Sequence, residues 1–297
     1  MRQPSFSFDE LRGAAKVSVP PVQSLTSADG TSLAYRCYAP PEPRAVLLFY
    51  HGGGAHSAAG YQFLGHGLQE EYETVVVTPD IRGHGASEGP RGDAPTPHHV
   101  WEDLSTFIRF LRGKFPGVPL VLGGHSSGAG LTLNYVTGKN REAVDGYVFL
   151  SPQLGMQAKA DRPSVAAPFA RVDPAAFAAY GASGGTTHGH DYAVHFNYPA
   201  EVLKSDPGLV SAITVTMSVA LVPSSPSEQF ASLNLPFGLW IGTDDELFLP
   251  ERVLAFGSLA NDRHSKTRVG TIEGGRHLSV LVQAHRTLGP WILDAVG

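Results

Sequence analysis

Apolar, β-branched segments alternate with amphipathic, helix-length segments along most of the chain. Short apolar runs predict buried strands, and between them apolar positions recur at helical spacing. This alternation is typical of an α/β protein, with a mostly parallel central sheet flanked by helices. The predicted strands are residues 45–50, 74–78, 120–123, 146–150, 236–242 and 267–272, with two antiparallel strands within 16–38. The predicted helices are residues 58–71, 98–114, 129–136, 250–260 and a last one from 278.

The alternation stops between residues 155 and 232, which are rich in Ala, Pro, Gly and Ser. Short helices are predicted there at residues 174–180 and 207–222. A connection of this length far exceeds an ordinary loop and predicts a helical cap or lid. It follows a strand whose carboxyl end lies at the edge where open α/β sheets bind ligands. The predicted organisation is therefore a core of residues 1–154 and 233–297, interrupted by a cap at 155–232.

Composition and charge narrow the functional classes. The 297 residues are 42% hydrophobic and 16% charged, which indicates a globular protein. The net charge of −5 and the lack of any Lys/Arg run argue against nucleic-acid binding. The single cysteine, Cys37, excludes an intrachain disulfide. Residues 213–222 are too short to span a membrane, and Asp9 and Glu10 interrupt the apolar stretch that a signal peptide needs. We expect a cytoplasmic protein without a transmembrane segment.

The sequence GHSSG at residues 124–128 has the G-x-S-x-G pattern of a nucleophile elbow. A serine in a tight strand-to-helix turn presses against neighbouring backbone, so glycine is needed two residues to either side. The pattern alone is common, but here an apolar strand precedes it and a helix-forming segment follows. We predict that Ser126 is a nucleophile whose helix N-terminus favours a developing negative charge.

A second glycine-rich motif, HGGG at residues 51–54, ends the first buried strand. An oxyanion hole needs backbone N–H groups about 3 Å from the developing negative oxygen. We expect one donor to be the amide of Ser127, which follows the nucleophile. The other donor is predicted to be the amide of Gly53, because the glycines let the chain approach a substrate closely.

The remaining catalytic residues are sought by position, because the chain order in this fold is serine, acid, histidine. His277 lies in a predicted loop before the last helix, where it can act as the base. An acidic cluster, Asp244, Asp245 and Glu246, follows the strand 236–242. Only one of the three can face the imidazole, and their positions alone leave the choice open.

Five blocks between residues 45 and 280 resemble the monoacylglycerol lipase and lysophospholipase branch of the α/β hydrolases. They also resemble the broader serine-aminopeptidase-like group. The blocks are HGGGAHSAAGY, PDIRGHGASEGPRG, GHSSG, IGTDDEL and EGGRH. The family pattern G-[ST]-x-D implies that the acid is Asp245, and the resemblance also implies base His277 and donors Gly53 and Ser127.

Two departures from the family concern acyl specificity. Ser127 and Ala129 stand where the family usually has Met and a second Gly. The HGGG motif is similar to that of the hormone-sensitive-lipase branch, but the Asp that precedes the nucleophile there is absent. Both departures leave the fold assignment intact.

These features predict a serine hydrolase that cleaves carboxylic esters through an acyl-enzyme on Ser126, without cofactor or metal. Its partner would be a small ester of monoacylglycerol, lysophospholipid or other lipophilic type. A peptidase, amidase or thioesterase would use the same triad. The cap aromatic and apolar residues could line the pocket or form the cap's own core, and the sequence favours neither: Phe169, Phe177, Tyr180, Phe196, Tyr198, Met217 and Leu221.

Other polar residues near these motifs are predicted to have structural roles. Three histidines beside motif glycines are expected to brace loops through hydrogen bonds: His51, His84 and His125. Three histidines of the insertion lack the cysteines or helical spacing of a structural zinc site, so no metal is expected there: His188, His190 and His195. Asp80 and Asp103 are expected to be charges on a loop and on a helix surface.

Overall fold

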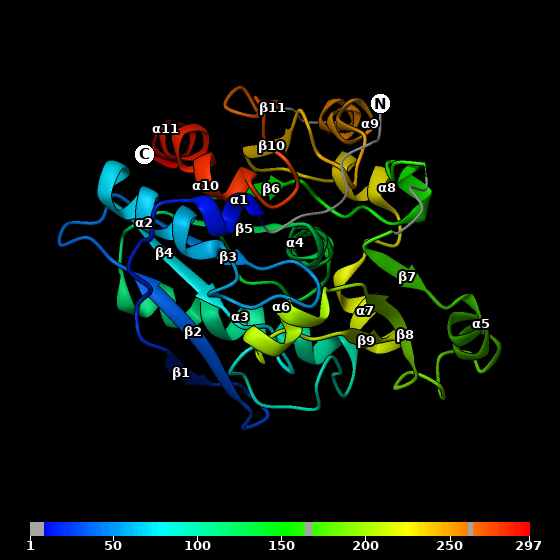
Figure 1. Cartoon of the computed structure of the whole chain (residues 1–297). Helices are drawn as coiled ribbons and strands as arrows, with labels where there is room; N and C mark the ends of the chain where they lie inside the picture. The colour runs from blue at the N-terminus through cyan, green and yellow to red at the C-terminus, as the bar shows by residue number, and fades with distance from the viewer. Residues whose placement is uncertain (1–8, 164–167, 261–263) are drawn as a thin grey trace.

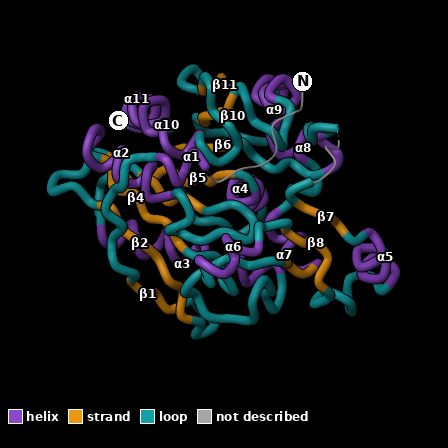
Figure 2. The backbone as a smooth tube through the Cα atoms, in the orientation of Figure 1, coloured by secondary structure: helices purple, strands orange, loops and turns teal. Residues whose placement is uncertain are grey.

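An eight-stranded sheet runs through the computed structural model, which describes residues 9–163, 168–260 and 264–297 (Figures 1 and 2). Its strand order is β1-β2-β4-β3-β5-β6-β10-β11, with β2 antiparallel to β1 and β4 and all other neighbours parallel. Residues 1–8 lie outside the described residues. They belong to the N-terminal segment whose sequence argues against a signal peptide. The strands are β1 (Gln23–Thr26), β2 (Ser32–Tyr38), β3 (Ala45–Tyr50), β4 (Thr74–Pro79), β5 (Leu120–His125), β6 (Gly146–Leu150), β10 (Phe237–Gly242) and β11 (Arg268–Ile272).

Helices cover both faces of the sheet because successive strand side chains point to opposite sides. In β3, Leu47 and Phe49 belong to one apolar cluster, whereas Leu48 and Tyr50 belong to the other. The first cluster is covered by α2 (Tyr61–Tyr72), α10 (Val280–Gln283) and α11 (His285–Val296). The second is covered by α3 (Pro97–Lys114), α4 (Ser127–Thr137), α7 (Val215–Leu221), α8 (Pro226–Ala231) and α9 (Pro250–Ala255). The predicted α/β class, a mostly parallel sheet flanked by helices, is confirmed.

The segment between β6 and β10 contains strands as well as helices. Three short strands form an antiparallel sheet in the order β7-β8-β9, at the right of Figure 1. The sequence predicted helices in this segment, which are present, but it did not predict the three-stranded sheet. The helix expected at 207–222 begins only at Val215, because residues 212–214 pair with β8. The further elements are η1 (Met156–Ala158), β7 (Ala170–Val172), α5 (Pro174–Ala182), β8 (Tyr192–Phe196), α6 (Ala200–Ser205) and β9 (Ala212–Thr214).

Two smaller elements complete the described chain. A short helix, α1 (Asp9–Gly13), packs its Leu11 side chain beside Gly60, just before α2. After α9 the chain continues as the 3₁₀ turn η2 (Phe256–Ser258), so the helix expected at 250–260 is shorter than predicted. The last helix is also divided, into α10 and α11. None of these differences alters the order of the core strands.

Candidate active site

Ser126 lies in a sharp turn between β5 and α4, with φ 55° and ψ −122°. A positive φ is uncommon for a residue with a side chain and indicates a backbone held in place by its surroundings. Both motif glycines are required by close backbone contacts. A Cβ on Gly124 would lie 2.2 Å from the carbonyl carbon of Gly128, and one on Gly128 would lie 2.3 Å from the Tyr50 oxygen. The sequence GHSSG therefore folds locally as predicted, with Ser126 half-buried at the start of a helix.

His277 and Asp245 come together behind this turn. Asp245 follows β10, His277 follows β11, and the His277 Nδ1 atom lies 2.9 Å from Asp245 Oδ2. The other carboxylate oxygen of Asp245 accepts the backbone N–H groups of Leu247 and Phe248, each at 2.9 Å. Both side chains are nearly inaccessible to solvent, with exposures of 3% for His277 and 0% for Asp245.

Burial and ion pairing act on these two groups in opposite directions. Burial alone lowers the pKa of His277, but the adjacent Asp245 carboxylate offsets this and leaves the pKa above its ordinary value. Burial alone raises the pKa of Asp245, but His277 and the two backbone N–H donors bring it below its ordinary value. Asp245 is therefore a carboxylate near neutral pH and holds the proton of the imidazole on Nδ1.

The neighbouring acids occupy different positions. Asp244 is exposed, and its backbone N–H donates to the carbonyl of Gly275. Glu246 is buried and accepts the backbone N–H of His277 at 2.9 Å. The structure thus brings Asp245, and not Asp244, against the imidazole. The anchoring of the His277 loop by Glu246 was missed from the sequence, where only the acidic cluster gave a signal.

His125 connects the serine turn to both neighbouring loops. Its Nε2 lies 2.8 Å from the carbonyl oxygen of His277, which can only accept, so Nε2 carries the proton. Its Nδ1 then accepts from the Tyr61 hydroxyl at 3.0 Å, and that oxygen accepts the Gly52 N–H at 2.6 Å. Burial lowers the pKa of His125 to about 3, so the ring is neutral. His125 is placed to brace loops; the part played by Tyr61 had no sequence signal.

The HGGG loop, defined here as residues 51–57, is held from several sides. The Ile81 N–H donates to Nε2 of His51, which leaves its Nδ1–H to donate to the Gly52 carbonyl at 2.8 Å. Gly52 O and the N–H of Gly53 belong to one planar peptide, so fixing the carbonyl also fixes the N–H direction. Because the Gly52 N–H is already bonded to Tyr61, the Gly53 amide is the better-placed donor in this loop.

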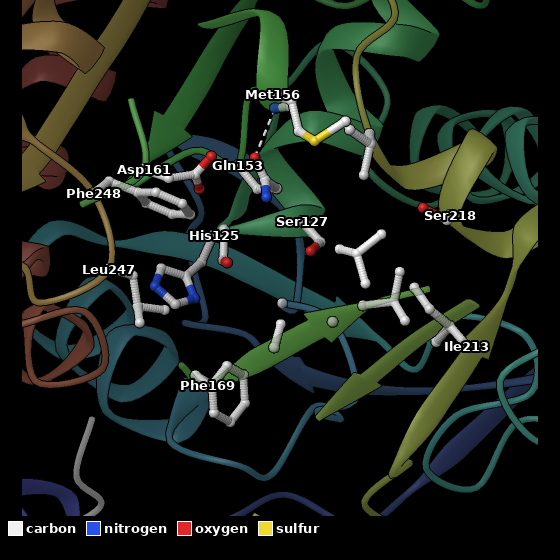
Figure 3. A pocket seen from close by; sticks show the side chains of 18 of the residues that line it. His125, Ser127, Gln153, Met156, Asp161, Phe169, Ile213, Ser218, Leu247 and Phe248 are labelled. Atoms are coloured by element: carbon white, nitrogen blue, oxygen red, sulfur yellow. Dashed lines mark hydrogen bonds between the residues drawn. The ribbon is translucent and has the colours of Figure 1, made fainter. Parts of the chain in front are cut away.

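Ser126, Ser127, Gly53 and His277 line one cavity of about 1430 Å³ beneath the β7-β8-β9 sheet. Figure 3 shows His125, Ser127 and Gln153 around it, with Phe169 and Ile213 on the side of that sheet. The N–H of Ser127, at the first position of α4, has no acceptor within the helix. The cavity therefore brings together the residues that the sequence proposed for the nucleophile, the base and the oxyanion donors.

The sequence left open whether the aromatic and apolar residues of the insertion line the pocket or form the cap core. The structure places some of them in each location. Four of them line the cavity: Phe169, Phe177, Phe196 and Tyr198. Met217 and Leu221 are fully buried in the core cluster, and Tyr180 packs with Phe177 in a small apolar cluster of the cap. Aromatic side chains of the cap segment thus contribute to the cavity wall.

The histidines of the insertion form separate pairs. His188 Nδ1 lies 2.8 Å from Asp191, and His190 Nδ1 lies 2.8 Å from Asp93 of the core, while His195 is on β8. Across residues 9–163, 168–260 and 264–297, no group of three or more potential ligand side chains converges on a metal position.

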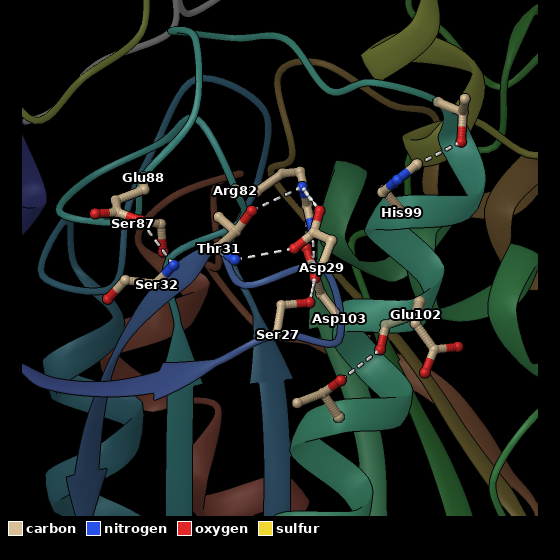
Figure 4. Close-up of polar contacts among 12 residues, drawn as sticks. Ser27, Asp29, Thr31, Ser32, Arg82, Ser87, Glu88, His99, Glu102 and Asp103 are labelled. Atoms are coloured by element: carbon tan, nitrogen blue, oxygen red, sulfur yellow. Dashed lines mark hydrogen bonds and ion pairs between the residues drawn. The ribbon is translucent and has the colours of Figure 1, made fainter.

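A buried ion-pair cluster supports the loop after β4 (Figure 4). Arg82 makes two hydrogen bonds of 2.7 Å to Asp103 of α3, with side-chain exposures of only 3% and 6%. Asp80 accepts the backbone N–H groups of Ser57 and Ala86. Asp80 lies in a loop as expected, although it is buried. The expectation that Asp103 is a charge on the helix surface is wrong, because its side chain is buried and compensates the donors of Arg82.

Replacing Arg82 by alanine is expected to lower the free energy of unfolding by about 3–5 kcal/mol, because Asp103 would remain buried without its counter-charge. Urea unfolding of the purified variant measures this. Arg109→Ala is the matched control, since that side chain is 48% exposed and its ion pairs are worth about 1 kcal/mol or less. Equal losses in the two variants would contradict the structural role of Arg82.

The sheet order, the serine at a strand-to-helix turn, and the acid and histidine after later strands define an α/β hydrolase. The profile of the family described as serine aminopeptidase, S33, matches residues 41–281, and the chain belongs to that family. The predicted family resemblance is thereby confirmed.

Curated relatives match part of the chain. A monoglyceride lipase of Saccharomyces cerevisiae is 32% identical over 117 residues, or 38% of this chain and 37% of that protein. The human monoglyceride lipase is 32% identical over 130 residues, or 43% and 42% of the two chains. The matches therefore span less than half the length of these relatives.

The fold likeness extends over nearly the whole chain. A solved structure of a soluble variant of the yeast monoglyceride lipase, in complex with a substrate analog, superposes with a TM-score of 0.71. It is 19% identical and covers 95% of this chain and 97% of that one. Among the described residues, no helix combines the length and apolarity needed to cross a bilayer.

Proposed function

We propose that the protein is a carboxylic ester hydrolase acting through a Ser-His-Asp triad of Ser126, His277 and Asp245. The observation that carries this proposal is the buried His277–Asp245 pair, joined at 2.9 Å, whose His277 lines the same cavity as Ser126 in its strained turn. The relatives that match part of the chain are monoglyceride lipases, which agrees with this proposal.

In the proposed reaction the Ser126 hydroxyl attacks the ester carbonyl carbon while Nε2 of His277 takes its proton. The resulting oxyanion accepts hydrogen bonds from the Gly53 and Ser127 amides. The carbon–oxygen bond to the alcohol then breaks as the imidazolium returns the proton to the leaving oxygen. Water, activated by the same imidazole, attacks the acyl-enzyme and releases the acid and Ser126. The mechanism uses only side chains and amides of this chain.

The proposed substrate is a lipophilic ester of monoacylglycerol or lysophospholipid type. The aromatic side chains of the cavity, Phe169, Phe177 and Phe196, offer apolar surface to an acyl group. We propose that residues 155–232 act as the cap over this site, since their β7-β8-β9 sheet supplies that wall. We propose a cytoplasmic location, in keeping with a sequence that has a single cysteine.

The proposal is tested with p-nitrophenyl esters from acetate to palmitate and aminoacyl p-nitroanilides, assayed with the purified chain. We expect turnover of esters, with kcat/KM rising with acyl length while added methylenes enter the apolar cavity, by up to about tenfold per methylene. Hydrolysis of the anilides but of no ester would favour the peptidase or amidase alternative. No turnover of either class would contradict the proposal.

A further inference from the structure

A cap segment, residues 196–210, here named the cap arm, touches the HGGG loop at several points. Phe196 packs so closely on Gly53 that a Cβ there would lie 2.8 Å from its ring. The Tyr198 hydroxyl donates to Gly53 O at 3.3 Å, and the Val210 N–H donates to Gly54 O at 2.8 Å. The carbonyls of Gly53 and Gly54 are therefore held by the cap.

The far end of the HGGG loop is fixed to the cap arm by a hydrogen-bonded pair, His56 and Asp206. His56 Nε2 lies 2.8 Å and 3.0 Å from the two carboxylate oxygens of Asp206, the residue after α6. His56 is largely buried, with 12% of its side chain exposed, and Asp206 is 36% exposed. The backbone N–H of Gly208 donates to the same carboxylate at 3.1 Å, which orients it toward the loop.

The protonation of this pair follows from its neighbours. Nδ1 of His56 accepts the Ala58 N–H at 3.3 Å, so the ring proton of the neutral form is on Nε2, facing Asp206. The hydrogen bond from His56 lowers the pKa of Asp206, which keeps it ionised near neutral pH. In this tautomer the Nε2–H donates to the Asp206 carboxylate.

We propose that Asp206 is a positioning residue for the oxyanion hole: through His56 it holds the HGGG loop so that the Gly53 amide points at the substrate oxygen. The inference rests on the proposed function of Gly53 as an oxyanion donor. Neither Asp206 nor His56 lines the cavity, so neither side chain is placed to touch the substrate itself. The cap would then help to build the catalytic geometry in addition to covering the site.

The second cap-to-core histidine pair provides a matched control. His190 and Asp93 also join the cap to a core loop at 2.8 Å, but Asp93 belongs to the loop after β4 and not to the HGGG loop. Removing the His190 ring therefore removes a cap-to-core contact of the same length, from a more exposed histidine, without touching the oxyanion donors. General loosening of the cap would affect both pairs, whereas the proposed role is specific to His56 and Asp206.

The test compares kcat and KM of the purified full chain for p-nitrophenyl butyrate. Asp206→Ala and His56→Ala are each expected to lower kcat about 10- to 100-fold, with KM changed by about threefold or less, because a displaced donor acts mainly on the transition state. The double variant should lose little more than either single variant. Asp206→Asn keeps an acceptor for His56 and should restore most of the rate, and His190→Ala should match wild type.

Affinity for an alkyl trifluoromethyl ketone, which forms an oxyanion on the serine, should fall by the same factor as kcat/KM in Asp206→Ala. Unchanged kcat in Asp206→Ala and His56→Ala, a change in KM alone, or an equal loss in His190→Ala would overturn the inference. Thermal unfolding checks each variant, and His56→Ala carries the test if Asp206→Ala does not fold. Loss of all turnover in Ser126→Ala alongside normal rates in Asp206→Ala would refute only this inference, whereas an active Ser126→Ala would refute the proposed function.

Discussion

Ester hydrolysis is expected to fall by about 10⁵- to 10⁶-fold when Ser126 is replaced by alanine, because the acyl-enzyme can no longer form. The alanine side chain retains the Cβ, and Ser126 already occupies its turn with φ 55°, so the backbone conformation is no more strained than before. Thermal unfolding near the wild-type temperature would show that the loss is chemical. The residual rate is measured with p-nitrophenyl butyrate.

Covalent labelling gives this prediction a second measurement. A fluorophosphonate should modify the wild-type chain once, at Ser126, as read by mass spectrometry of the peptides, and should leave Ser126→Ala unmodified. The control is Ser258→Ala, an exposed serine on η2 outside the cavity, which should keep both rate and labelling. Wild-type turnover by Ser126→Ala would remove this serine from the reaction.

The core sheet could be predicted from the sequence because its parallel strands are buried on both faces. Each of the strands β3, β4, β5 and β10 has six residues, and all of them are buried. Strands buried on both faces appear in a sequence as nearly continuous apolar runs. Their order in the sheet has no comparable sequence signal, since β3 lies between β4 and β5 through pairings of distant segments. The apolar pattern therefore predicted the elements, whereas their order in the sheet depends on pairing between distant segments.

The cap sheet could not be predicted in the same way. Strand β7 has only three residues, Ala170–Val172, and all of them are exposed, so no alternation of apolar and polar positions marks it. Strand β9 is equally short and runs directly into α7 at Val215, which made the whole stretch resemble one helix. Both strands depend on pairing with β8 rather than on their own composition.

Some residues of the candidate site could likewise be predicted from the sequence, and others could not. Ser126, Gly53 and His277 could be proposed because their motifs need glycine at fixed spacing, and a glycine requirement is visible in the sequence. Tyr61 and Asp206 could not, because their partners are distant. Tyr61 bonds His125 across 64 positions, and Asp206 bonds His56 across 150. Neither residue has a local sequence property that indicates such a contact.

The acidic cluster after β10 gives the other large expected effect. Asp245→Asn should reduce kcat by about 10⁴-fold, the size seen when the equivalent carboxylate of a serine protease is neutralised, because the amide no longer holds the Nδ1 proton of His277. Asp244→Asn should stay within about twofold of wild type, since that side chain is exposed and only its backbone joins the site. A larger loss in Asp244→Asn would move the acid by one residue.

The pH profile separates an electrostatic role of Asp245 from a merely structural one. Catalysis needs neutral His277, whose pKa lies above its ordinary value of 6.5. Wild-type kcat/KM should therefore fall as the pH decreases through that raised pKa. Without the carboxylate, burial remains and lowers the pKa of the imidazole, so the residual activity of Asp245→Asn should persist to lower pH. An acidic limb at the same pH in both proteins would mean that Asp245 does not set the charge of His277, even if its loss slows the reaction.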